Sequence, residues 1–137
     1  MKLLLDTHVL IWQLEDSSRI SDAVYAEMQK SANEDQLLVS AITPWEIALL
    51  TAKGRLKLKR EVDEWLEAAL GLPGIHLEAL SPSIAVASSR LPGQIHGDPA
   101  DRILVATARH TDATLVTADR ELLGYAAQGF VKCMAPA

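Results

Sequence analysis

Short apolar runs alternate with segments of helical pattern along the whole chain, and this alternation constrains its fold most. The runs that predict strands are Lys2–Leu5, Leu37–Ser40, Ile75–Leu80, Thr114–Thr117 and Phe130–Met134. The segments that predict helices are Thr7–Glu15, Ser21–Asn33, a stretch opened by Thr43 that ends near Gly54, Glu61–Leu70, Pro82–Leu91, Arg102–His110 and Arg120–Ala127. Strands that alternate with helices predict an α/β protein whose central parallel sheet carries helices on both faces.

The size and cysteine content of the chain predict one domain, residues 1–137, in a reducing compartment. A chain of 137 residues with 49% hydrophobic residues can bury one sizeable core. The lone cysteine, Cys133, excludes a disulfide scaffold within the chain and favours a cytoplasmic location. No apolar run approaches the ~20 residues that a membrane-spanning helix needs, so we expect no membrane segment.

The charges of the chain are unevenly distributed. The net charge of −5 argues against a protein that coats nucleic acid over its whole surface. Five cations nevertheless gather between residues 53 and 60, namely Lys53, Arg55, Lys57, Lys59 and Arg60. This basic segment is either a solvated loop or a strip that holds the phosphates of a nucleic acid, and the sequence leaves both interpretations open.

Acidic residues follow the predicted strands at places that meet in space. Asp6 directly follows the first strand, Asp119 follows the fourth, and Glu46 lies in the first turn of the helix after the second. Asp98 and Asp101 open the helix that precedes the fourth strand. Because the carboxyl ends of parallel strands share one edge, these carboxylates are expected to converge. Mg²⁺ or Mn²⁺ would relieve their repulsion, and such an ion can activate water and stabilise charge on a phosphoryl group.

Each of these acids also has a purely structural interpretation. Asp98 and Asp119 suit helix N-caps, and Glu46 would complete a capping box with Thr43. Asp6 fits this explanation least, because a carboxylate between two apolar runs is costly to bury without a partner. His8 and His96 stand outside any recognised metal-ligand spacing, so we expect them to be exposed or satisfied by ordinary hydrogen bonds.

Four motifs together resemble one known family. They are Leu3-Leu4-Leu5-Asp6-Thr7-His8, Trp45-Glu46-Ile47-Ala48, Asp98-Pro99-Ala100-Asp101-Arg102 with the helix that follows, and Leu115-Val116-Thr117-Ala118-Asp119. In order and spacing they resemble the PIN-domain ribonucleases, and within these the VapC toxins of toxin–antitoxin pairs. The resemblance implies an α/β/α sandwich and a Mg²⁺- or Mn²⁺-dependent endoribonuclease, commonly a homodimer, that a cognate antitoxin inhibits.

The resemblance also implies roles for particular residues. Asp6, Glu46, Asp101 and Asp119 match the acidic residues of the family, and Asp98 is an additional acid beside them. We favour Asp101 over Asp98 as the ligand because the stretch after it aligns with the family's helix. The hydroxyls of Thr7 and Thr117 are candidates to bond water held by the ion, or they are ordinary turn residues.

Two other functions use the same sequence features. The carboxylates would also serve a metal-dependent phosphohydrolase of small phosphate esters, although the D-x-D nucleophile pair is absent. A catalytically silent binding module would keep the fold without the chemistry. The large apolar residues Trp12, Leu14, Trp45 and Leu49 are expected mostly in the core, with some available for a groove that binds an amphipathic antitoxin segment.

Overall fold

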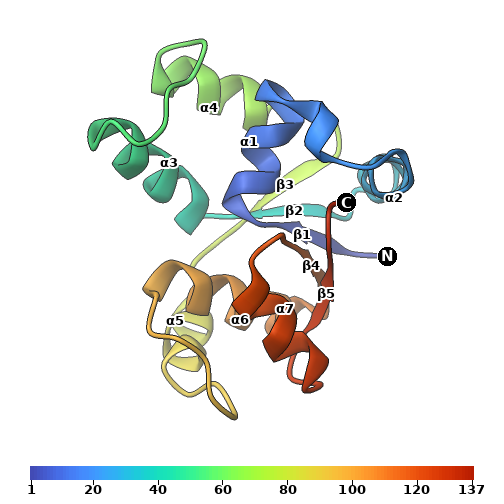
Figure 1. Ribbon diagram of the computed structural model, residues 1–137, viewed down its shortest axis with the longest axis vertical. Helices are drawn as coiled ribbons and strands as arrows, with labels where there is room; N and C mark the ends of the chain where they lie inside the picture. Colours follow the sequence, from blue (N-terminus) through green and yellow to red (C-terminus); the bar gives the residue numbers. More distant parts are fainter.

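The computed structural model describes residues 1–137 as a five-stranded parallel sheet between two layers of helices (Figure 1). The strands are β1 (Leu3–Leu5), β2 (Leu37–Ser40), β3 (Ile75–Glu78), β4 (Thr114–Val116) and β5 (Lys132–Met134). Their order in the sheet is β3-β2-β1-β4-β5, and every neighbouring pair is parallel. The predicted α/β/α architecture is therefore confirmed.

Seven α-helices and one short 3₁₀ turn connect the strands. They are α1 (Thr7–Glu15), the 3₁₀ turn η1 (Ser17–Arg19), α2 (Asp22–Asn33), α3 (Ile42–Ala52), α4 (Val62–Leu70), α5 (Pro82–Ser88), α6 (Pro99–Thr111) and α7 (Arg120–Ala127). Figure 1 shows α1 to α4 on one face of the sheet and α5 to α7 on the other. No helix is both long and apolar enough to cross a bilayer.

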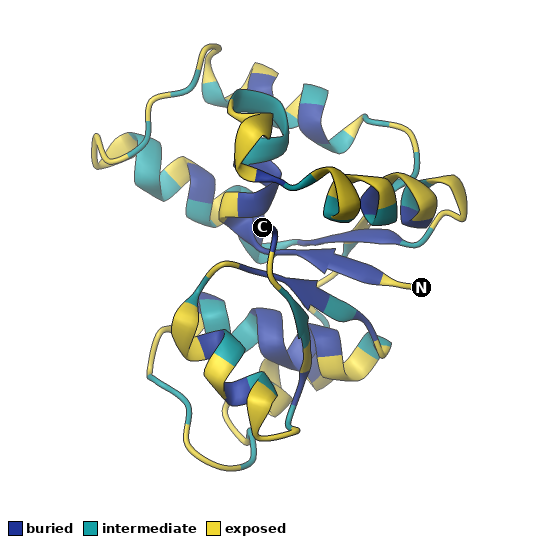
Figure 2. Ribbon diagram, turned by 45° about the vertical axis from the view of Figure 1, so that its right-hand side comes forward, coloured by how far each residue is buried: buried dark blue, intermediate teal, exposed yellow.

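Successive side chains along a strand point to opposite faces of the sheet, so the protein has two hydrophobic cores, one on each face. Leu3 and Leu5 point to the core beneath α1 to α4, whereas Leu4 between them belongs to the core beneath α5 to α7. All three leucines are fully buried, as a central parallel strand covered on both faces requires. Figure 2 shows this pattern as a dark band of buried sheet and inner helix faces, with exposed residues on the outer helix surfaces.

Two local predictions were wrong. The third helix begins at Ile42, one residue before the predicted cap Thr43, and its N-cap residue Ala41 has no capping side chain. Instead the Ser40 hydroxyl accepts a hydrogen bond from the Ile42 N–H at 3.1 Å. Trp45, expected mostly in the core, is 55% exposed, while Trp12 and Leu14 are half-buried against the core as predicted.

Candidate active site

The topology creates a switch point between β1 and β4. From β1 the chain moves to β2 across one face of the sheet, and it returns to β4 across the other. Ligands of open parallel sheets bind beyond the carboxyl ends of the strands at this kind of position. Asp6 follows the last residue of β1, and Asp119 lies three positions after the end of β4. The fold therefore brings the first and last predicted acids to one place.

Asp6 is held by a hydroxyl rather than by an ion pair. It is 7% exposed, and its Oδ2 accepts a hydrogen bond from Thr117 Oγ1 at 2.6 Å. Although Asp6 precedes α1, its side chain does not cap that helix. Burial raises the pKa of Asp6, and the Thr117 hydrogen bond opposes the rise. A buried carboxylate with one neutral partner fits a ligand role better than a structural one.

Glu46 is oriented by a pair of buried threonines. Thr7 Oγ1 donates a hydrogen bond to Glu46 Oε1 at 2.5 Å and lies 3.1 Å from Thr43 Oγ1. Thr43 thus faces α1 instead of capping its own helix, so the predicted capping box is absent. Burial raises the pKa of Glu46, and the charge of Asp6 raises it further. Thr7 and Thr117 both bond carboxylates, and in this structure they act as supports for the acids.

Asp98 and Asp119 do cap helices, as their structural interpretation predicted. Asp98 Oδ1 accepts from the Asp101 N–H at 3.1 Å. Asp119 Oδ1 accepts from the N–H groups of Glu121 and Leu122 at 2.8 and 3.1 Å. Capping occupies one oxygen of each carboxylate and leaves the other free for a ligand. The two interpretations of these acids are therefore compatible, since capping fixes the direction in which each carboxylate points.

The carboxyl pKa of Asp101 is strongly raised. Burial and the charges of Asp98, Asp6, Asp119 and Glu46 together raise its pKa to about 7. A cation in the site would favour the charged form of this carboxyl and oppose the rise of its pKa. Strongly shifted acids of this kind cluster at functional sites.

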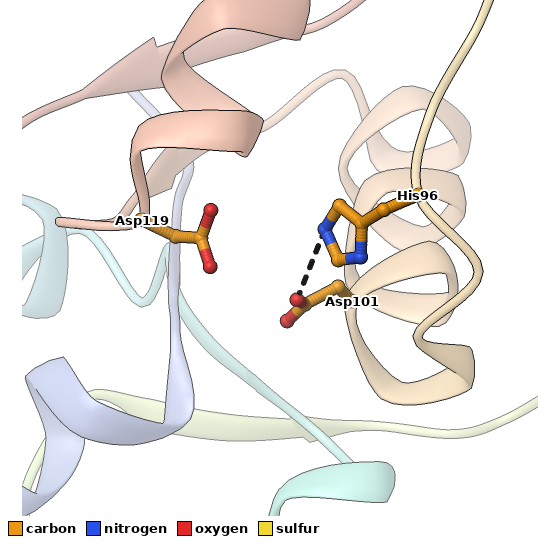
Figure 3. A group of neighbouring side chains, drawn as sticks. All are labelled: His96, Asp101 and Asp119. Carbon is orange, nitrogen blue, oxygen red and sulfur yellow. Dashed lines mark ion pairs between the residues drawn. The ribbon is translucent and has the colours of Figure 1, made fainter.

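His96 also reaches the site, contrary to the expectation of an uninvolved histidine. Its Nε2 lies 3.3 Å from Asp101 Oδ2 and 3.3 Å from Glu121 Oε2, and Figure 3 shows the ring beside Asp101 and opposite Asp119. Nε2, Asp101 and Asp119 offer ligand atoms that all lie within 4.8 Å of one another. Nδ1 accepts the Asp98 N–H at 3.4 Å. His96 therefore lies against Asp101, with a ring nitrogen within reach of the same space as the carboxylates of Asp101 and Asp119.

The acids line one pocket of about 310 Å³. Its walls contain five carboxylates together with three other residues, in full Asp6, His8, Trp12, Glu46, Asp98, Asp101, Ala118 and Asp119. The protein has a larger cavity of about 710 Å³ between α5 and α6, but no acidic residue lines it. The candidate active site is therefore identified by the carboxylates that line the smaller pocket, and not by the size of the cavity.

A hard divalent cation suits this set of donors. Five carboxylates meet without a lysine or arginine in the pocket, and burial together with their repulsion raises the pKa of Asp101. Oxygen-rich donors of this kind are those that Mg²⁺ and Mn²⁺ prefer. The donor set and the crowding of charge both fit such an ion.

The basic segment has the arrangement of a solvated loop. Lys53, Arg55, Lys57, Lys59 and Arg60 are all exposed and form no ion pair, while Leu56 and Leu58 between them pack against the core. The segment begins where α3 ends. Glu46, predicted in the first turn of this helix, is its fifth residue because the helix begins at Ile42. The structure therefore presents five free cations at the far end of the helix from which Glu46 reaches the acidic pocket.

Together the fold and the pocket define a class: parallel α/β proteins with a cluster of carboxylates at the switch point of the sheet. Comparison with known proteins identifies the family. The PIN domain model matches residues 3–128, and the chain belongs to the PIN domain family.

Comparisons with individual proteins support this family assignment. The chain is 36% identical over 120 residues to Ribonuclease VapC22 of Mycobacterium tuberculosis, which covers 88% of each sequence. It shares its fold with VapBC2 of Rickettsia felis bound to a promoter DNA fragment, at a TM-score of 0.71, 18% identity and 98% coverage of both chains. FitAcB of Neisseria gonorrhoeae is also similar, with a TM-score of 0.67, 25% identity and coverage of 98% and 97%.

Proposed function

We propose that this protein is a divalent-metal-dependent endoribonuclease that hydrolyses RNA phosphodiester bonds and acts as the toxin of a toxin–antitoxin pair. The observation that carries the proposal is the pocket of five carboxylates at the switch point of a PIN fold. The 36% identity to a ribonuclease over most of both chains supports the same activity.

The proposal gives each acid a defined task. Asp6, Glu46, Asp101 and Asp119 hold Mg²⁺ or Mn²⁺, and Asp98 adds a fifth carboxylate at the rim. Thr117 and Thr7 fix Asp6 and Glu46 through short hydrogen bonds, so little reorganisation is needed when the ion binds. His96 holds Asp101 towards Asp119.

The bound ion would lower the pKa of water and offset the charge that develops on the phosphate. The residues of the chain supply position. Asp6 is nearly buried, and the buried Thr7, which contacts Thr43, donates the hydrogen bond that holds Glu46.

The basic segment is proposed to hold phosphates that flank the cleaved bond. It starts seven residues after Glu46, roughly 10 Å along the helix axis. Neutralising Arg55, Lys57 and Lys59 to Gln is expected to weaken binding of all single-stranded RNAs alike and to lower the salt slope by roughly 2. Unchanged affinity and slope would restore the interpretation of a merely solvated loop.

One assay separates the proposed activity from the two alternatives. Wild type is incubated with Mn²⁺ and either a single-stranded RNA or a chromogenic phosphate monoester. The proposal predicts cleavage of the RNA inside the chain and no release of phosphate from the ester. Turnover of the ester alone would identify a small-ester phosphohydrolase, and no turnover of either would identify a silent binding module.

The proposed partners follow from the family and have their own tests. A cognate antitoxin is expected to bind and inhibit the enzyme, and a homodimer is the expected assembly. Coexpression with the adjacent gene should abolish toxicity, and sedimentation velocity should give twice the mass of 14.9 kDa. The lone Cys133 fits a reducing compartment such as the cytoplasm.

A further inference from the structure

A second concavity opens directly beside the acidic pocket. It has a volume of about 360 Å³, and the two share Trp12 and Ala118 as walls. Its other walls include Arg19 from η1, Arg120 and Leu123 from α7, and Pro136 near the end of the chain. We call this concavity the Trp12 pocket. A ligand that fills the acidic pocket and extends past Trp12 enters it without leaving the protein surface.

The charged side chains that line the surface change from acidic in the acidic pocket to basic in the Trp12 pocket. The acidic pocket has five carboxylates, whereas the Trp12 pocket has two arginine side chains and no acidic side chain among its walls. Trp12, Leu123 and Pro136 make the rest of the surface largely apolar. Two guanidinium groups beside an apolar surface match a nucleotide, which carries an anionic phosphate next to a flat base.

Arg19 is held in place before any ligand binds. Its guanidinium carbon lies 5.0 Å from the centroid of the Trp12 ring, and its Nε is 3.4 Å from Asp16 Oδ2. The terminal Nη groups of Arg19 have no partner in the chain, and Arg120 is exposed and free of ion pairs. A guanidinium fixed on an aromatic ring loses less entropy when it binds a phosphate than a freely rotating side chain.

We propose that the Trp12 pocket is a subsite for the nucleotide adjacent to the cleaved phosphodiester, and that it selects single-stranded RNA. Arg19 and Arg120 bind the phosphate, and the base packs on the apolar wall that Trp12, Leu123 and Pro136 form. A base enters a pocket of this kind only when it is unpaired and unstacked, so a regular duplex is excluded. The proposal rests on the proposed ribonuclease function and adds the part of the substrate that sets specificity.

The test measures binding of short single-stranded RNA to variants of the full chain. Arg19→Gln and Arg120→Gln remove one exposed charge each, and Arg90→Gln, an exposed arginine just after α5 that lines neither of the two pockets, is the matched control. Each pocket variant is expected to weaken RNA binding by roughly tenfold and to lower the salt slope by ~0.7. The control should change affinity by less than twofold. Equal effects of all three variants would overturn the proposal.

A scan with abasic RNA tests the base contact. Removing one particular base should weaken binding to wild type, and this loss should disappear in Trp12→Ala. Trp12 also packs against the core, so Trp12→Phe, which keeps most of that packing, is measured beside it. An abasic profile that is flat in wild type would refute the base contact.

The outcomes also distinguish this proposal from the proposed function. If wild type cleaves no RNA, the ribonuclease proposal fails first. If all variants cleave the same sites with unchanged KM, the ribonuclease proposal stands and the subsite is wrong. If Arg19→Gln and Arg120→Gln leave RNA binding intact but abolish binding of the antitoxin, the pocket is a protein interface and the subsite is equally wrong.

Discussion

Replacing Asp101 with asparagine should make the metal-free protein more stable at alkaline pH. The pKa of Asp101 is about 7 in the folded protein, against 3.8 for an unperturbed aspartate. A carboxyl that binds its proton more tightly in the folded state destabilises that state as the pH rises from about 4 through about 7. The asparagine side chain keeps the shape of the aspartate without its charge, so the variant escapes this penalty.

The structure sets the size of the effect. Between pH 5 and the folded pKa of about 7, the penalty grows by at most roughly 3 kcal/mol. The Asp101 side chain is 16% exposed and its acidic neighbours share protons with it, so we expect a smaller effect of ~1 kcal/mol.

Urea unfolding in EDTA at pH 5 and pH 8 measures this difference. The stability of Asp101→Asn relative to wild type should be ~1 kcal/mol more favourable at pH 8 than at pH 5. Glu67→Gln, an exposed substitution in α4 with the same change of charge, should show no such dependence. A relative stability that is equal at both pH values, or lower at pH 8, would refute the account of charge crowding.

Further predictions concern the ion and its supports. Mn²⁺ at a hundredfold excess over its Kd should stabilise wild type by ~2.7 kcal/mol in thermal melts, and Asp119→Asn should lose most of this gain. The same gain in both proteins would place the ion elsewhere. Thr117→Val removes the hydroxyl that donates to Asp6 at 2.6 Å, so it should cost ~1–3 kcal/mol of stability and weaken Mn²⁺ binding in calorimetry. Thr51→Val, whose hydroxyl bonds only its own helix, should leave Mn²⁺ affinity unchanged.

The fold could be predicted because its signals are local. Three consecutive leucines before Asp6 indicate a strand buried on both faces, and a polar residue at the strand end marks the sheet edge. The convergence of Asp6 and Asp119 followed from the rule that parallel strands end at one edge. The order of the strands was not visible in any local pattern, although it creates the switch point at which these acids meet.

The errors came from contacts between distant segments. Thr43 has the sequence context of a cap, but the hydroxyl of Thr7, 36 positions away, engages it instead. Trp45 sits in an apolar helix, yet the packing of α3 leaves its ring outside the core. His96 precedes Asp98 in a loop without ligand spacing, and only the folded arrangement of α6 and α7 brings it to Asp101 and Glu121.

The central claim is that the carboxylates at the switch point, acting with a divalent ion, cleave RNA. Its most direct test is incubation of total RNA with wild type and Asp6→Asn, each in Mn²⁺ and in EDTA, followed by mapping of the new RNA ends. The account predicts discrete internal cuts only for wild type in Mn²⁺, with both proteins equally folded by circular dichroism. The same cuts from Asp6→Asn, or from wild type in EDTA, would contradict it.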